Sequence, residues 1–230
     1  MSYKHITIGI LGGIGPEATG SFYLKLIYEI QKQKLVKSNT DYPRIIINSI
    51  PAPELTSKIK RAQLTAYIEG VKSLEKYGTD FIVMACNTIH LYHSLLQKEV
   101  GIPILNLRNA VGKFLKDEKF KSVSVFGTPA TVKSGLYKFS GIGYSNPKKK
   151  ELEQLSSAIE NFNKGYQRKE QIIKVGALAD KHIKNGAEII ILGCTEISLM
   201  LTDSKIPKID TMDLLVKATV KYLRTIKKQF

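Results

Sequence analysis

The chain has 230 residues, a net charge of +15 and 43% hydrophobic residues, enough apolar material for one large α/β unit or two small ones. Two cysteines are too few for a secreted disulfide scaffold, and no apolar run approaches the ~18 residues of a membrane span. We therefore expect a cytoplasmic protein with reduced thiols and no membrane contact. The lysines are scattered at the spacing of solvated helix faces without an aromatic platform, so we predict no nucleic-acid partner.

The first half of the chain alternates predicted strands with predicted helices. Runs of β-branched residues mark the strands, and apolar residues at helical spacing mark the helices. The strands are expected at residues 4–11, 44–50, 81–85 and 101–105, and the helices at residues 18–34, 59–77, 91–99 and 111–120. This alternation predicts a parallel sheet with right-handed crossovers.

A second series of elements begins at residue 122. Strands are expected at residues 122–126, 189–192 and 208–210, with a short strand in the loop of residues 141–150, and helices at residues 131–139, 151–185 with a break at 163–165, 199–201 and 212–228. Because the halves match in architecture, we predict an α/β fold of two similar lobes, each a mainly parallel sheet flanked by helices. The first lobe would comprise residues 1–113 and 208–230, and the second residues 114–207. The site is expected in the cleft between the lobes.

The two stretches that contain the cysteines are the most informative. Residues 81–90 (FIVMACNTIH) and 188–197 (EIIILGCTEI) each run from an apolar strand into a cysteine followed closely by threonine. Buried parallel strands deliver such polar groups to their carboxyl ends, where open α/β sheets keep their sites. A helix beginning at Cys86 and at Cys194 would favour the thiolate form of each.

Two thiols facing each other across a cleft allow two kinds of chemistry. They can close a disulfide, although they lack the C-x-x-C spacing of redox motifs. Alternatively, one thiolate removes a proton from a carbon between them and the other thiol returns a proton to the opposite face, which inverts the configuration. Such a site needs donors that stabilise a developing enolate, and side chains suited to hold a carboxylate are present at Asn87, Thr88, Thr128 and Thr195.

Several other interpretations stay open at this point. His90, four residues after Cys86, allows a Cys–His hydrolase, but it can equally be a wall residue. The cysteines with His90, His93 or His182 do not have the usual spacing of zinc ligands, so we predict no metal. Each cysteine can also be a small buried hydrophobe. The amides of the Gly12–Pro16 turn (GGIGP) can face a ligand, with Gly13 the candidate, while Glu196 can simply charge a helix N-terminus.

The chain resembles the aspartate/glutamate racemase superfamily, and most closely the aspartate racemase branch of cofactor-independent two-cysteine amino-acid racemases. The matching motifs come in family order and span nearly the whole chain. They are GILGGIGP (9–16), PRIIIN (43–48), ACNTIH (85–90), FGT (126–128), SGLY (134–137), GCTEI (193–197) and IDT (209–211).

The resemblance implies a homodimer that needs no cofactor and acts on a small amino acid. Cys86 and Cys194 would be the acid/base thiols, and Lys164 matches a lysine placed near the substrate's side-chain carboxylate. The side chains implied around the substrate's α-carboxylate and amino group are those of Asn87, Thr88, Thr128 and Thr195.

One loop departs from the family pattern. Aspartate racemases carry a Pro-x-Arg-Thr type loop here, whose arginine holds the side-chain carboxylate. This chain has Pro53, Glu54, Leu55 and Thr56, so the bidentate anchor is missing and an acidic residue stands beside its place. The departure favours a neutral or larger side chain, as in broad-specificity members, although Lys58, Lys60 or Arg61 could substitute. The alternatives are a related carbon-acid isomerase, of hydantoin racemase or diacid isomerase type, and a non-catalytic carboxylate-binding protein.

Overall fold

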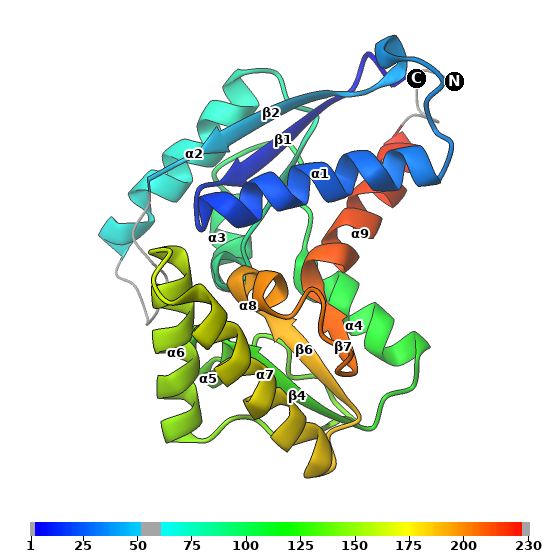
Figure 1. Ribbon diagram of the computed structural model, residues 1–230. Coiled ribbons are helices and arrows are strands. Elements are labelled where there is room, and N and C mark those ends of the chain that lie inside the picture. Colours follow the sequence, from blue (N-terminus) through cyan, green and yellow to red (C-terminus); the bar gives the residue numbers. More distant parts are fainter. Residues whose placement is uncertain (1–2, 52–60, 227–230) are drawn as a thin grey trace. The chain divides into compact units, whose positions relative to one another are not determined.

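A computed structural model describes residues 3–51 and 61–226 of the protein (Figure 1). The described residues divide into two compact units. Unit 1 comprises residues 3–51, 61–107 and 212–226, and unit 2 comprises residues 108–211. Each unit is built around its own parallel sheet flanked by helices, which confirms the predicted fold class. Within these residues no helix is both long and apolar enough to cross a membrane.

Unit 1 contains a three-stranded parallel sheet in the order β2-β1-β3. Its strands are β1 (Thr7–Gly12), β2 (Arg44–Ser49) and β3 (Phe81–Met84). β1 is central, so Leu11 lies in register with Met84 on one side and with Asn48 on the other. All four residues of β3 are buried, because a strand covered on both faces must be apolar throughout. β1 and β3 therefore end side by side.

Helices cover both faces of this sheet. Right-handed crossovers place α1 (Pro16–Lys32), which joins β1 to β2, on one face, and α2 (Thr65–Lys76), which leads into β3, on the other. α9 (Thr211–Ile226) returns from the end of the chain to lie beside α1 (Figure 1), and Lys25 Nζ and Asp213 Oδ1 are 2.6 Å apart. The ring of Tyr222 on α9 packs edge-on against Phe81 at 4.9 Å. The short elements of this unit are η1 (Asn39–Asp41), η2 (Arg61–Leu64), η3 (Thr88–Tyr92) and α3 (His93–Gln97).

Unit 2 contains a four-stranded parallel sheet in the order β5-β4-β6-β7. Its strands are β4 (Ser122–Gly127), β5 (Gly143–Tyr144), β6 (Ile189–Gly193) and β7 (Lys208–Asp210). The central pair ends together, since Gly127 and Gly193 are partners in the register. The sheet therefore brings the residues that follow β4 and β6 to one edge.

The helices of unit 2 are α4 (Leu107–Asp117), which starts on the last residue of unit 1, α5 (Pro129–Lys133), α6 (Lys149–Asn163), α7 (Arg168–Lys184) and α8 (Thr195–Met200). α6, α7 and α8 pack with β4 and β6 into one hydrophobic cluster that includes Phe126, Phe162 and Ile197. The predicted break at residues 163–165 is confirmed: α6 ends at Asn163, and Gly165 has a φ of 71°.

Three predicted elements differ from the structure. Residues 101–105 form no strand: only Ile104 bridges to Ile82, because Pro103 has no N–H with which to extend the ladder. The helix expected at residues 131–139 ends at Lys133, since Gly135 adopts a φ of 69°. The helix expected at residues 91–99 is a 3₁₀ turn followed by the short α3.

Candidate active site

The carboxyl edge of the unit 1 sheet holds the first group of predicted site residues. The amide of Ala85 donates to the carbonyl of Leu11 (3.0 Å), so the chain leaves β3 alongside β1. Gly13 turns the chain there with a φ of 87°, and a Cβ atom on it would lie 2.3 Å from the carbonyl oxygen of Ile50. Only glycine fits this turn. The Gly13 amide, predicted to face a ligand, donates to Thr19 Oγ1 (3.0 Å).

Cys86, Asn87 and Thr88 follow β3 after the single residue Ala85 and are buried, with 8%, 2% and 3% of their surfaces exposed. Thr88 begins a 3₁₀ turn of five residues, so the stabilising α-helical dipole expected next to Cys86 is reduced to one short turn. Tyr67 of α2 is fully buried nearby. Burial raises the pKa of its phenol, and the proximity of Cys86 raises it further, so Cys86 has a neutral phenol in its surroundings.

His90 does not act as a base toward Cys86 in this arrangement. Its Nε2–H donates to the carbonyl of Met84 (3.3 Å), and its Nδ1 accepts from the amide of Leu107 (3.4 Å). Burial, with a smaller contribution from His93, lowers the pKa of His90 to about 3. A neutral imidazole with both nitrogens bound to the backbone serves as a structural clamp, which argues against the Cys–His hydrolase.

The carboxyl edge of the unit 2 sheet holds the second group. A Cβ atom on Gly127 would lie 2.8 Å from the carbonyl oxygen of Gly193, so two glycines let β4 and β6 approach closely where they end. Thr128 and Cys194 follow these glycines. The Thr128 hydroxyl caps α5: it accepts from the amide of Thr131 (3.2 Å) and donates to the Thr131 hydroxyl (3.2 Å).

Glu196 lies at the same edge and has a role that the sequence does not indicate. The Cys194 thiol donates to Glu196 Oε2 at 2.8 Å, and the Thr195 hydroxyl donates to the same oxygen at 3.0 Å. Cys194, Thr195 and Glu196 are only 4–5% exposed. A glutamate in the first turn of a helix is interpreted from sequence as a helix-dipole partner, and no signal in the sequence says that it turns back to the thiol.

The remaining predicted residues are Lys164 and those of the specificity loop. Lys164 is an exposed residue that caps the C-terminal end of α6. The specificity loop of Pro53, Glu54, Leu55 and Thr56 lies outside the described residues, as do Lys58 and Lys60.

Two further histidines are engaged in the fold rather than grouped with the cysteines. His93 Nε2 donates to the carbonyl of Ile104 (2.8 Å). His182 Nδ1 donates to the carbonyl of Ser145 (2.7 Å) and lies 3.0 Å from the Ser124 hydroxyl. Across residues 3–51 and 61–226, no cluster of three or more His, Cys, Asp or Glu side chains could hold a metal ion.

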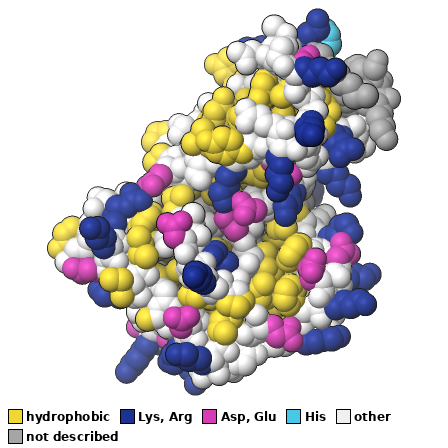
Figure 2. All heavy atoms as spheres, turned by 45° about the vertical axis from the view of Figure 1, so that its right-hand side comes forward, with side chains coloured by type: hydrophobic (Ala, Val, Ile, Leu, Met, Phe, Trp, Pro, Cys, Tyr) yellow, Lys and Arg dark blue, Asp and Glu magenta, His cyan; other side chains and the backbone are white. Residues whose placement is uncertain are grey.

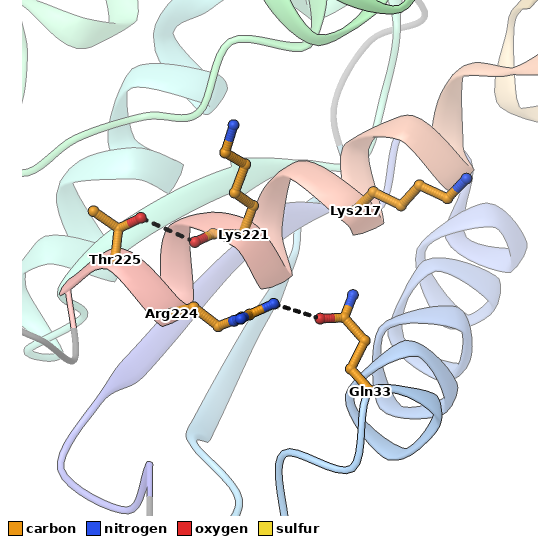
Figure 3. Close-up of a pocket in the computed structure, with 5 residues that line it drawn as sticks. All are labelled: Gln33, Lys217, Lys221, Arg224 and Thr225. Carbon is orange, nitrogen blue, oxygen red and sulfur yellow. Dashed lines mark hydrogen bonds between the residues drawn. The ribbon is translucent and has the colours of Figure 1, made fainter.

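Lysine and arginine side chains are mixed with other types on one face of the described residues (Figure 2), and they also line a pocket in unit 1. On the face drawn in Figure 2, lysine and arginine side chains alternate with acidic and hydrophobic ones rather than forming a single basic surface. A pocket of about 480 Å³ in unit 1 is lined by Gln33, Lys217, Lys221, Arg224 and Thr225 (Figure 3). Gln33 follows the C-terminal end of α1, roughly 25 Å along a 17-residue helix from Gly13, so this pocket is separate from the sheet edge that carries Cys86.

Comparisons with known proteins agree on one family. The family model described as "Asp/Glu/Hydantoin racemase" matches residues 11–219. The broad specificity amino-acid racemase RacX of Bacillus subtilis (strain 168) is 32% identical over 223 residues, which cover 93% of this chain and 96% of RacX. The structure of the Picrophilus torridus aspartate racemase is similar with a TM-score of 0.77 at 27% identity, covering 95% of this chain and 94% of that one. The structure of an aspartate racemase homologue of Pyrococcus horikoshii OT3 is similar with a TM-score of 0.71 at 28% identity, covering 95% of this chain and 99% of that one.

Proposed function

The chain belongs to the Asp/Glu/Hydantoin racemase family, and on this premise we propose that it is an amino-acid racemase that exchanges the proton at Cα between two thiols. The observation that carries the proposal is that both cysteines of the chain follow a buried parallel strand at the carboxyl edge of a sheet, Cys86 after β3 and Cys194 after β6. Polar groups at these edges are where open α/β sheets bind ligands.

In the proposed reaction both cysteines act on Cα of one bound amino acid. One cysteine, as thiolate, takes the α-proton from one face, and the other, as thiol, gives a proton to the opposite face. The developing enolate needs donors placed before the reaction. Asn87 and Thr88 beside Cys86, with Thr128 and Thr195 at the other edge, supply amide and hydroxyl groups for this role. The Thr128 hydroxyl donates to Thr131 in the structure described here, so it must turn to donate to the substrate. The Thr195 hydroxyl can accept from the substrate's amino group while it continues to donate to Glu196.

No cofactor is required for this chemistry, because the thiols move the proton and the donors stabilise the charge. Gly13 shapes the turn that bounds the site, and Lys164 is proposed to reach the side chain of the substrate. We propose that the enzyme is a cytoplasmic homodimer whose only other partner is the small amino acid.

The substrate is inferred to be an amino acid of broad side-chain type rather than aspartate alone. Leu55 stands where an arginine would hold a side-chain carboxylate, and Glu54 stands beside it, so an acidic side chain loses its bidentate partner. The relative RacX is named a broad specificity amino-acid racemase, which supports the same inference.

The decisive experiment is incubation of the purified protein with single L-amino acids in deuterium oxide without added cofactor. We expect loss of the α-proton signal and appearance of the D-isomer, measured by proton NMR and chiral chromatography. Acidic, neutral and basic amino acids are tested in parallel, which also ranks the side chains. Absence of both exchange and D-isomer across all three classes would overturn the proposal.

A second candidate is racemisation of a 5-substituted hydantoin, because the matching family description includes hydantoin racemase. The carbon acid is similar, but the substrate has no free carboxylate or amino group. Running a hydantoin beside the amino acids separates the two, since turnover of the hydantoin alone would replace the leading proposal.

A further inference from the structure

The hydrogen bond between Cys194 and Glu196 gives this thiol a proton acceptor of its own. We propose that Glu196 is the positioning residue that takes the proton of Cys194 when this cysteine becomes a thiolate, and that it holds this proton through the turnover. The inference rests on the proposed function, because it concerns the state in which Cys194 removes the α-proton.

The geometry restricts where the thiol proton can go. Glu196 Oε2 accepts from the Cys194 thiol at 2.8 Å and from the Thr195 hydroxyl at 3.0 Å. The second bond fixes the carboxylate in the orientation that receives the first. With only 4% of Glu196 exposed, water has little access to its carboxylate, so the thiol and the hydroxyl supply much of the hydrogen bonding that a buried charge requires.

The surroundings of the pair are mostly apolar. Cys194 belongs to the hydrophobic cluster to which α6 contributes Leu155 and Phe162 and α7 contributes Val175. From β7, Asp210 faces α8 through Ser198, whose hydroxyl donates to Asp210 Oδ1 at 2.9 Å. Asp210 is thus the charged group that reaches α8 from the strand packed beside β6, and its hydrogen bond is made to Ser198 rather than to the thiol.

A thiolate and a carboxylate this close cannot both be charged at low cost in a dry site. The pair therefore shares one proton. At rest the proton is on sulfur and Glu196 is a carboxylate. When the proton moves to Glu196, Cys194 becomes the thiolate, and the charge of the pair stays at minus one.

The proton balance of one turnover follows from this. Cys194, as thiolate, takes the proton from Cα, and the electron pair of that C–H bond stays on the substrate as an enolate. The Cys86 thiol then gives its proton to the opposite face of Cα. The site is left with a Cys194 thiol, a protonated Glu196 and a Cys86 thiolate, which carries the same total charge as before. Transfer of one proton from Glu196 to Cys86 through solvent, after product release, restores the starting state.

The test reads the thiol directly and needs no turnover. Because the chain has only two cysteines, Cys86→Ser leaves Cys194 as the sole thiol. Its alkylation by iodoacetamide is followed against pH with and without Glu196→Gln. The substituted amide retains an oxygen that accepts from the thiol but carries no charge, so we expect the midpoint of the pH profile to fall by at least about one unit, and alkylation near neutral pH to be roughly tenfold faster.

Two variants complete this experiment. Glu196→Ala must also lower the midpoint of the alkylation pH profile. This variant keeps the test decisive if the glutamine variant folds poorly. Circular dichroism monitors the folding of each variant. Glu170→Gln is the matched control, since Glu170 is an exposed residue in the first turn of α7, and its profile should coincide with that of the parent. Unchanged midpoints in both Glu196 variants would overturn the proposal even if the protein racemises amino acids.

A second readout uses turnover and separates a functional role from a structural one. A racemase has an equilibrium constant of one, so Glu196→Gln must lower kcat/KM equally for both enantiomers. The primary isotope effect, in contrast, can differ between the two enantiomers, because the equilibrium constant does not fix which proton transfer limits the rate. With α-deuterated substrates, we expect it to rise for the enantiomer whose proton Cys194 removes and to fall toward one for the other. Equal changes for the two enantiomers would contradict the assignment.

Discussion

The ends of β3 and β6 are alike in sequence and different in electrostatics. Each strand is fully buried and is followed by a cysteine and a threonine. After β3, the ionisable side chain four residues beyond the cysteine is His90, which turns to the backbone at Met84 and Leu107. After β6, the ionisable side chain two residues beyond the cysteine is Glu196, which turns to the thiol itself. The comparison teaches that similar strand ends can hold two thiols that are not interchangeable.

The largest expected effect comes from removing each thiol in turn. Cys86→Ser and Cys194→Ser should each lower racemisation by about 1,000-fold or more, because an acid or base that acts on Cα contributes roughly 10²–10⁴ in rate. Each variant should still exchange the α-proton of one enantiomer with deuterium oxide, and the two variants should differ in which enantiomer that is. Normal racemisation by either variant, or exchange of the same enantiomer by both, would remove the contrast between the strand ends.

Replacement of His90 tests whether the neutral imidazole that joins Met84 to Leu107 stabilises the end of β3. His90→Phe should lower the free energy of unfolding by about 2–4 kcal/mol, since it leaves the buried carbonyl of Met84 and the amide of Leu107 without their ring partner. Urea denaturation measures this change. His5→Gln, at an exposed histidine, should change stability by less than about 0.5 kcal/mol.

The same residue predicts a pH dependence. Burial lowers the pKa of His90 from 6.5 to about 3, so the unfolded chain binds a proton there that the folded chain does not. Its contribution to stability is therefore complete above pH 6.5 and is lost as the pH falls toward 3, at up to about 1.4 kcal/mol per pH unit. The slope should be smaller in His90→Gln than in the parent; an equal slope would show that other groups cause it.

A smaller effect is expected at the glycines that shape the two edges. Gly127→Ala should cost about 1–3 kcal/mol, because the new Cβ would lie 2.8 Å from the carbonyl oxygen of Gly193. Gly20→Ala is the control: nothing lies within 4 Å of the added atom in α1, so it should be neutral or raise stability by up to about 1 kcal/mol. Thermal unfolding compares the two, and similar melting temperatures would mean that the close approach of β4 and β6 is dispensable.

The smallest effect should come from a substitution of Ser198, whose hydroxyl contacts the backbone of Cys194. Its hydroxyl joins Asp210 to the carbonyl of Cys194 (2.9 and 3.4 Å), so Ser198→Ala should cost about 1 kcal/mol and leave racemisation within about threefold of the parent. Ser157→Ala, on the exposed face of α6, should change neither. A large loss of activity in Ser198→Ala, but not in Ser157→Ala, would mean that Ser198 also takes part in the function of the Cys194–Glu196 pair.

Much of the fold can be predicted from the sequence because the buried strands have strong local signals. The apolar runs of β3 and β6 clearly predict buried strands. Gly165 marks the break between α6 and α7. The failures come from single residues that override a pattern. Pro103 limits an apolar segment to one bridge, and Gly135 stops α5 after five residues.

The site was predictable only to the level of which side chains reach a sheet edge. Strand ends indicate Cys86, Asn87, Thr88, Thr128 and Cys194 as such residues. Where a side chain turns depends on tertiary packing, which the sequence does not state. The bond from Cys194 to Glu196, the use of the Thr128 hydroxyl as a cap, and the contact of the Gly13 amide with Thr19 are therefore seen only in the folded structure.

The way α9 completes unit 1 has a consequence for synthesis of the chain. Unit 1 draws its last helix from residues beyond unit 2, and the Phe81–Tyr222 ring contact and the Lys25–Asp213 ion pair join that helix to elements made much earlier. Residues 108–211, in contrast, are contiguous. On the ribosome the second sheet can close as soon as residue 211 emerges, whereas the first must wait until residues 212–226 have been made, with one flank of its sheet uncovered. The N-terminal part of the chain is thus the part that stays incomplete longest during synthesis.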